Sequence, residues 1–128
     1  MRSIAITLSG LALAAVLAAC GSANAVDPSA SAAPVDPNAV HVQAMGMDFA
    51  TKEVDATAGK AFTIAFDNSA GAAPHNVDIV DASGKSVFQG SIVDAGDSAS
   101  YSVPALAAGI FGFRCDLHPD MKGTVVVK

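Results

Sequence analysis

Short runs of alternating apolar and polar residues recur from residue 39 to the end of the chain, and they constrain the fold more than any other feature. A period of two over four to eight residues is typical of a β-strand with one buried face. The clearest runs are residues 40–44, 61–66, 75–79, 86–89, 99–103, 111–115 and 123–128. No convincing helix is found, because the alanine-rich stretch 70–73 is short and ends at Pro74. The sequence therefore predicts an all-β domain of about seven to eight short strands, arranged as a sandwich or barrel.

The residues before 39 have a different character. Residues 1–19 combine Arg2 with an apolar run and small residues, which is typical of an export signal. A transmembrane anchor is the alternative, but the run is short for a span and is diluted by serine, threonine and glycine. Leu17-Ala18-Ala19-Cys20 resembles the bacterial lipobox, which implies cleavage before Cys20 and lipid attachment to it.

Residues 20–38 are rich in glycine, alanine, serine and proline, and we interpret them as a flexible tether. The folded domain is then expected at residues 39–128. It would be exported and held by lipid at the outer face of the cytoplasmic membrane or in the periplasm.

The formal net charge is −5, and the isoelectric point is about 4.8. Nucleic-acid binding is not expected, because it needs a basic stripe. The acidity is consistent with encounters with a basic partner, or with solubility alone. At this length one domain is expected, and we expect a monomer.

Three side chains with soft or borderline donor atoms lie close together near the C-terminus. Cys115, His118 and Met121 have the spacing Cys-x-x-His-x-x-Met. Two imidazoles and a thiolate in a trigonal plane, with a weak axial thioether, form the blue-copper electron-transfer site. A second histidine is therefore required from elsewhere in the chain.

The strand pattern proposes His75 as that second histidine. Cys115 continues the inward face of Phe111 and Phe113, and His75 begins the inward face of Val77 and Ile79. Both therefore lie where a core-facing row meets a loop, with Asn76 and Asp78 expected on the opposite face. With Cys20 assigned to lipid, Cys115 is the remaining thiol, and no internal disulfide is available. A buried, inert cysteine is the alternative.

Other candidates carry less weight. His41 lies in the first predicted strand and is expected at the surface or an edge rather than as a ligand. Met45 and Met47 are expected to fill gaps in the core, with the rim of the site as the alternative.

At these residues the chain resembles the cupredoxins, the small blue copper proteins such as plastocyanin and amicyanin. The resemblance is carried by Ala73-Pro74-His75-Asn76-Val77 and by residues 109–123, and it covers nearly all of residues 39–128. It implies a Greek-key β-sandwich with one copper ion held by His75, Cys115 and His118, with Met121 as axial ligand. Pro74 and Asn76 would lie just outside the ligands, and Asn76 matches a position that ties the two ligand loops together. Asp116 departs from the family's usual residue beside the cysteine.

The expected function is electron transfer between redox protein partners, such as a cytochrome or a copper oxidoreductase, with His118 as the electron port. A copper carrier or chaperone of the cell envelope would use similar ligands and release the metal. Single-chain catalysis by a copper enzyme is not expected, because only His41 is left for another metal site. A metal-free sandwich remains an alternative. Zinc would accept cysteine and histidine, but methionine is a poor zinc ligand.

Overall fold

The computed structural model describes residues 36–128, which form nine strands with no helix among them. The predicted signal at 1–19, Cys20 and most of the predicted tether lie outside the described residues. No helix in the described part is long and apolar enough to cross a membrane. The strands are β1 (Val40–Gly46), β2 (Asp48–Phe49), β3 (Glu53–Ala56), β4 (Phe62–Gly71), β5 (Asp78–Val80), β6 (Ser86–Gln89), β7 (Ser98–Val103), β8 (Gly109–Arg114) and β9 (Lys122–Val127).

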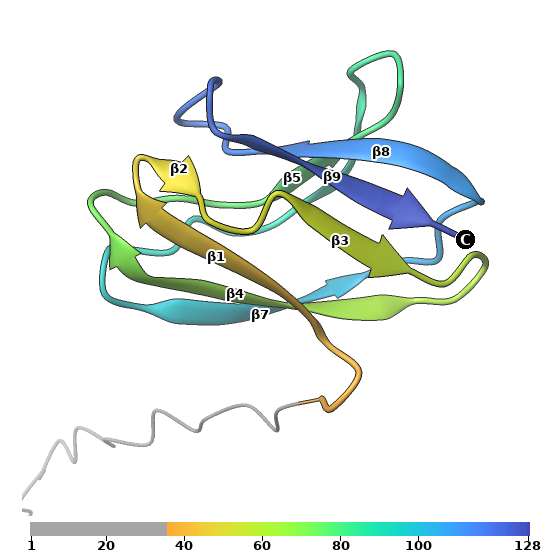
Figure 1. The fold of residues 1–128 in the computed structure, drawn as a ribbon, viewed down its shortest axis with the longest axis horizontal. Coiled ribbons are helices and arrows are strands. Elements are labelled where there is room, and N and C mark those ends of the chain that lie inside the picture. Colours follow the sequence, from red (N-terminus) through yellow and green to blue (C-terminus); the bar gives the residue numbers. More distant parts are fainter. Residues whose placement is uncertain (1–35) are drawn as a thin grey trace, which may run out of the picture. The chain divides into compact units, whose positions relative to one another are not determined.

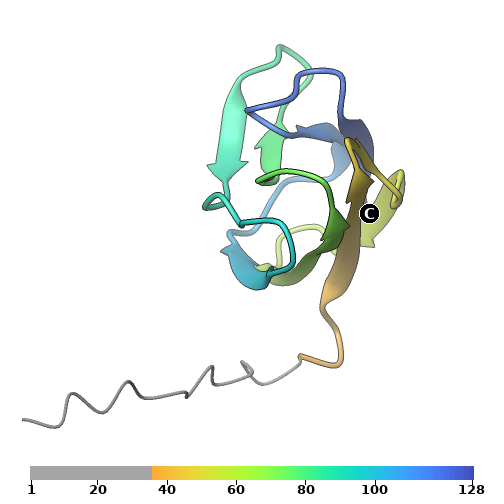
Figure 2. The same ribbon diagram turned by 90° about the vertical axis from the view of Figure 1, so that its left-hand side faces the viewer.

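The strands form two layers, which Figures 1 and 2 show from two directions. One sheet has the order β2-β1-β4-β7, and the other has the order β3-β9-β8-β5-β6. The β1–β4 and β3–β9 pairs are parallel, and the other pairs are antiparallel. Because the chain crosses between the two layers several times, the domain is a Greek-key sandwich, as predicted.

The core lies between the two sheets and follows the predicted alternation. β4 buries Ile64 and Phe66, and β9 buries Val125 and Val127. The ring of Phe113 on β8 packs edge-on against Phe49, with centroids 4.9 Å apart. Such aromatic pairs add about 0.5–1.5 kcal/mol to the stability gained from burial. The core therefore fixes the end of β8, directly before Cys115.

The strand count differs from the prediction because β2 and β3 contain only two and four residues. The alternation in β3 is complete, with Val54 and Ala56 buried, but it is too short to be distinguished from a loop by sequence alone. The predicted strand 75–79 also differs, because regular pairing begins only at Asp78 and His75 forms an isolated bridge with Val93.

Asn76 and Asp78 were expected on a face opposite the core, yet both are buried, at 2 % and 1 % exposure. Polar partners cover them: Arg114 Nε lies 2.9 Å from an Asp78 carboxylate oxygen, and Ser86 also donates to Asp78. A carboxylate can be buried when it is paired and hydrogen-bonded in this way. The β3-β9-β8-β5-β6 sheet therefore buries hydrogen-bonded polar side chains in addition to the apolar core.

Candidate metal centre

The loop from Cys115 to Met121 joins β8 to β9 and is held by its own backbone. The Cys115 N–H donates to the Met121 carbonyl at 3.1 Å, and the Met121 N–H donates to the His118 carbonyl at 2.9 Å. The His118 N–H donates back to the Cys115 carbonyl at 3.3 Å. Since Arg114 and Lys122 are paired in the hairpin, both ends of this ligand loop start from fixed strands.

His75 reaches the same end of the sandwich from a separate segment. Its backbone N–H donates to the Val93 carbonyl at 3.0 Å, and the Val93 N–H donates back at 2.8 Å. The buried amide of Asn68, at the end of β4, reinforces this segment by donating to the carbonyls of Ala73, Val93 and Asp94, each at 3.0 Å. The histidine is therefore positioned by backbone and amide hydrogen bonds outside its own ring.

The orientation of the His75 ring is also fixed. Its Nε2 lies 3.0 Å from the Gly46 carbonyl oxygen, at the end of β1. A carbonyl can only accept, so Nε2 carries the proton and Nδ1 keeps a free lone pair. A hydrogen bond to the other ring nitrogen is the usual way in which a ligating histidine is oriented.

The inward-facing donor atoms form a small triangle. Cys115 Sγ lies 3.7 Å from His75 Nδ1 and 3.6 Å from His118 Nδ1, and the two Nδ1 atoms are 3.1 Å apart. The centre of such a triangle lies about 2 Å from each corner, close to the length of metal–nitrogen and metal–sulfur bonds. The three residues therefore fit a metal ion without any rearrangement.

Burial differs among the four candidate ligands. His75 and Cys115 are fully buried and Met121 is 1 % exposed, whereas His118 is partly exposed. Met121 immediately precedes β9, and its side chain is shielded from water. Of the three corners of the triangle, His75 and Cys115 are therefore buried, and His118 is the one that reaches the surface.

Asn76 and Asp116 connect the two segments that supply the ligands. The Asn76 amide donates to an Asp116 carboxylate oxygen at 2.7 Å, and the Asp116 N–H donates to Asn76 Oδ1 at 2.9 Å. Desolvation tends to raise the pKa of Asp116, but hydrogen bonds from Asn76 and Gln89 and the nearby Arg114 charge outweigh it and lower the pKa. Pro74, next to His75, is exposed and restricts the backbone through its fixed φ.

The other sequence candidates contribute no donor atom to the triangle. His41 is exposed on β1, as expected, and it pairs with β4 on one side only, because β2 joins β1 no earlier than Ala44. Met45 and Met47 are 58 % and 54 % exposed, so the expectation that they fill the core is wrong. They flank Gly46 at a surface turn, where Gly46 has φ of 59°.

Sequence reasoning missed the residues that hold His75 in place. The Gly46 carbonyl carries no side-chain signal, and Asn68 lies seven residues before His75, on β4. The polar character of Asn68 within an alternating strand was the one available signal, because a buried amide needs partners.

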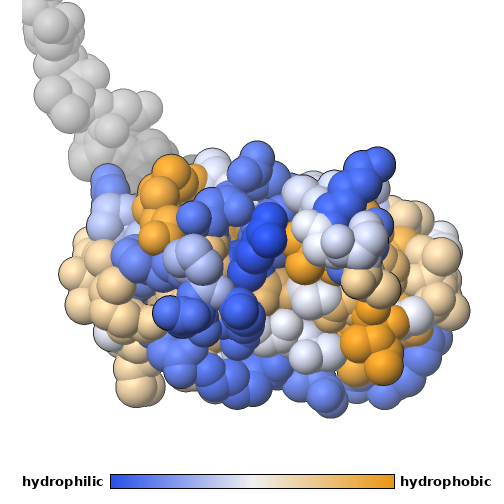
Figure 3. Space-filling model, turned by 90° about the horizontal axis from the view of Figure 1, so that it is seen from above, coloured by the Kyte–Doolittle hydropathy of each residue, from blue (hydrophilic) through white to orange (hydrophobic). Residues whose placement is uncertain are grey.

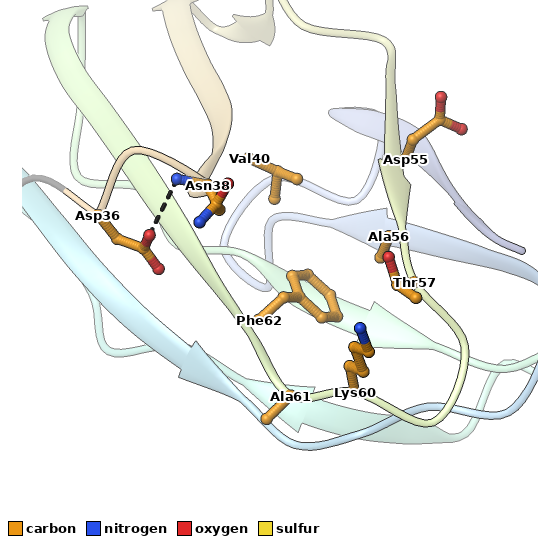
Figure 4. Close-up of a pocket in the computed structure, with 9 residues that line it drawn as sticks. All are labelled: Asp36, Asn38, Val40, Asp55, Ala56, Thr57, Lys60, Ala61 and Phe62. Atoms are coloured by element: carbon orange, nitrogen blue, oxygen red, sulfur yellow. Dashed lines mark hydrogen bonds between the residues drawn. The ribbon is translucent and has the colours of Figure 1, made fainter.

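A cavity of about 480 Å³ lies at the opposite end of the domain (Figure 4). It is lined by Asp36, Asn38, Val40, Asp55, Ala56, Thr57, Lys60, Ala61 and Phe62. Val40 begins β1 and Gly46 ends it, so a strand of roughly 20 Å separates this cavity from the His75 side. Its lining offers neither imidazole nor sulfur, so this cavity lacks the donor atoms found in the His75–Cys115–His118 triangle.

The face seen in Figure 3 mixes hydrophilic residues with separate hydrophobic patches.

Fold and site together define a class: a small Greek-key sandwich with a nitrogen–sulfur metal centre at one end. The sequence matches the family model of the cupredoxin-like domain over residues 10–127. The chain belongs to this family. No curated protein matches it.

Solved structures agree with this assignment. An oxidised P96G mutant of amicyanin is 28 % identical, with a TM-score of 0.56, and the match covers 75 % of this chain and 88 % of amicyanin. Auracyanin from Roseiflexus castenholzii is 20 % identical, with a TM-score of 0.61 and coverage of 71 % and 97 %. Auracyanin A from Chloroflexus aurantiacus, a blue copper protein, is 21 % identical, with a TM-score of 0.60 and coverage of 70 % and 98 %. The two auracyanins support the fold alone.

The donor set and the family point to the same metal. Thiolate, thioether and imidazole suit copper, and a trigonal arrangement of two imidazoles and one thiolate is the type 1 geometry. The described residues converge in this arrangement at His75, Cys115 and His118, with Met121 buried in the same loop. The cofactor of this domain is therefore copper.

Proposed function

We propose that this protein is a type 1 copper electron carrier in which His75, Cys115 and His118 are equatorial ligands and Met121 is the weak axial ligand. The supporting observation is the triangle of donor atoms, with sides of 3.1–3.7 Å. Bound copper supplies a one-electron couple between Cu(I) and Cu(II). The strands and the closed loop hold the donors in one geometry, so little rearrangement accompanies oxidation.

His118 is the proposed route for electrons, because its ring lies between the enclosed site and the surface. Leu117, which is 47 % exposed, and the exposed Pro119 flank it. Apolar side chains around a partly exposed ligand suit brief contact with a redox protein, since they can be desolvated at low cost. The net charge of −5 favours a partner with a basic surface.

Addition of Cu(II) to the purified apo domain tests the proposal. One copper per chain, an intense blue band and a reversible one-electron couple are expected. His75→Ala should abolish the blue band, while His41→Ala, an exposed histidine outside the triangle, should leave it unchanged. A colourless product, or two coppers per chain, would contradict the assignment.

A copper carrier of the cell envelope is the alternative, since His118 is accessible to an acceptor. Burial of the other three donors favours retention of the metal. Incubation with an apo-acceptor protein distinguishes the two functions. Rapid loss of the blue band to the acceptor would identify a carrier, whereas retention with fast electron exchange supports electron transfer.

We further propose that lipid on Cys20 tethers the mature domain outside the cytoplasmic membrane. The two cysteines provide matched variants. Cys20→Ser should release a blue protein from the membrane fraction, whereas Cys115→Ser should remain in that fraction and lose its colour. A Cys20→Ser protein that stays with the membrane would contradict lipid attachment.

A further inference from the structure

Met45 and Met47 lie on either side of Gly46, in the tight turn that joins β1 to β2. Met45 pairs with Asp48 in this hairpin, so Gly46 and Met47 are the two central residues of the turn. Gly46 has φ of 59°, and a glycine with positive φ at the first central position is typical of two-residue hairpin turns. We call residues 45–48 the methionine turn.

Both methionine side chains of this turn are open to solvent. Met45 is 58 % exposed and Met47 is 54 % exposed, whereas Met121, the other methionine among residues 36–128, is 1 % exposed. The Cα atoms of Met45 and Met47 are no more than about 7.6 Å apart, which is twice the spacing of consecutive Cα atoms. Because methionine is unbranched and turns about three bonds, both sulfurs can reach one ion between them.

The backbone of the methionine turn is fixed at the copper end of the domain. The Gly46 carbonyl accepts from the Ala72 N–H at 3.0 Å and lies 3.0 Å from His75 Nε2. The other nitrogen of the same ring, Nδ1, is a corner of the donor triangle. The methionine turn therefore touches the ring of a proposed ligand, on the edge opposite the triangle.

The free donors of the turn are soft. The Asp48 carboxylate is already engaged, because one oxygen accepts from the Phe49 N–H at 2.8 Å and the other from Lys52 Nζ at 2.6 Å. Thioethers select Cu(I), and they are poor ligands for zinc. Two exposed thioethers therefore favour Cu(I), and addition of Cu(II) should still fill one site per chain.

We propose that Met45 and Met47 form a second, exposed site that collects Cu(I) and supplies it to the triangle. This proposal rests on the proposed function, because the ion that it collects is the copper of that site. An ion held at the same end of the domain acts at a high effective concentration, which speeds its capture by the triangle.

The burial of the triangle explains why such a site is useful. His75 and Cys115 are fully buried, so copper reaches them past His118, which is partly exposed. The ion stays Cu(I) throughout the transfer. The bonds to the two thioethers break, a bond to Cys115 sulfur forms, and the thiol proton is released to water.

NMR of isotope-labelled methionine methyl groups tests the site. Cu(I) is added without oxygen to the apo protein, and the signals are assigned by single substitutions to leucine. The Met121 signal should respond to the first equivalent, and the Met45 and Met47 signals should shift together with the second. Two signals that stay fixed through the second equivalent would overturn the proposed site.

Two variants show whether the pair acts as a chelate. In Met47→Leu, the Met45 signal should need about tenfold more Cu(I) to shift, because the second thioether no longer acts at high effective concentration. Ile110→Met is the matched control, since it adds one exposed methionine on β8, where Ile110 is 72 % exposed. A control methyl that shifts at the same Cu(I) concentration as Met45 and Met47 would show adventitious binding and overturn the site.

A loading measurement tests the supply of copper. Apo protein is mixed with limiting Cu(I) on a weak soluble chelator, and samples are oxidised with ferricyanide at intervals, so that the blue band counts the filled triangles. Rates are compared as fractions of each protein's final blue band. Substituting both Met45→Leu and Met47→Leu should slow loading by about tenfold. A rate equal to that of the wild type would overturn the supply role.

The two proposals fail in different ways. If the wild-type protein forms no blue site and the Met121 signal ignores the first equivalent, the proposed function fails, while the Met45 and Met47 signals still test the turn. If the blue site forms and these two signals stay fixed, only the Cu(I) site fails.

Discussion

Replacing Asn68 with alanine is expected to destabilise the segment that carries His75. The Asn68 amide donates to three carbonyls, of which Val93 O and Asp94 O also accept from backbone N–H groups. With two amide hydrogens available, the substitution removes about two hydrogen bonds, at about 1 kcal/mol each. It also leaves the Ala73 carbonyl without this donor, but it removes the buried Asn68 Oδ1, which has no hydrogen-bond partner, so the total loss is about 2–3 kcal/mol. For a domain of this size the thermal midpoint should fall by roughly 15 °C.

The measurement is thermal unfolding of the copper-free protein, because bound metal would add its own stabilisation. Asn38→Ala is the control, since Asn38 is exposed and exposed substitutions usually change stability by less than about 0.5 kcal/mol. Asn68→Asp should be worse than Asn68→Ala, because it places a charged acceptor against three carbonyls. An Asn68→Ala midpoint within about 3 °C of the wild type would show that these hydrogen bonds do not hold the His75 segment.

Four further substitutions test other parts of the structure. Gly123→Ala should cost about 1–3 kcal/mol in urea unfolding, because its Cβ would lie 2.1 Å from the buried Phe113 ring. Tyr101 donates to the Ser91 carbonyl at 2.6 Å, and burial raises its pKa to about 12. Stability from this neutral phenol is complete below about pH 10 and is lost as pH rises towards 12, so Tyr101→Phe should flatten this part of the pH–stability curve. Met121→Leu should keep copper bound and raise its potential in voltammetry; a lower potential would refute the axial role. Leu117→Ser should slow electron exchange with a redox partner without changing the potential, whereas an unchanged rate would place docking elsewhere.

Much of the fold could be predicted from the sequence because burial alternates in most strands. Phe113 and Cys115 are both buried, as their parity with Phe111 indicates, and His75 shares the burial of Val77 and Ile79. Two strands were missed because β2 has only two residues, and because the four residues of β3 alternate around the small Ala56, which gives a weak apolar signal.

The surroundings of the site were harder to predict, because hydrogen bonds between distant segments leave little trace in local patterns. The Gly46 carbonyl meets His75 from 29 positions away, and any residue would supply the same atom. Asp78 seemed to face water because Arg114, its partner, lies 36 positions further along the chain. The predicted signal, lipidation and tether at residues 1–38 remain predictions.

The position of β9 in its sheet has a consequence for how this domain is made. β9 is the final strand, yet it lies between β3 and β8 and pairs in parallel with β3. Until residues 122–127 are available, β3 lacks its sheet neighbour and the ligand loop has only one fixed end. Pairing across such a large sequence separation forms slowly, since the chain must first close a long loop. The ligand loop is therefore fixed at both ends only after residues 122–127 have been synthesised and paired.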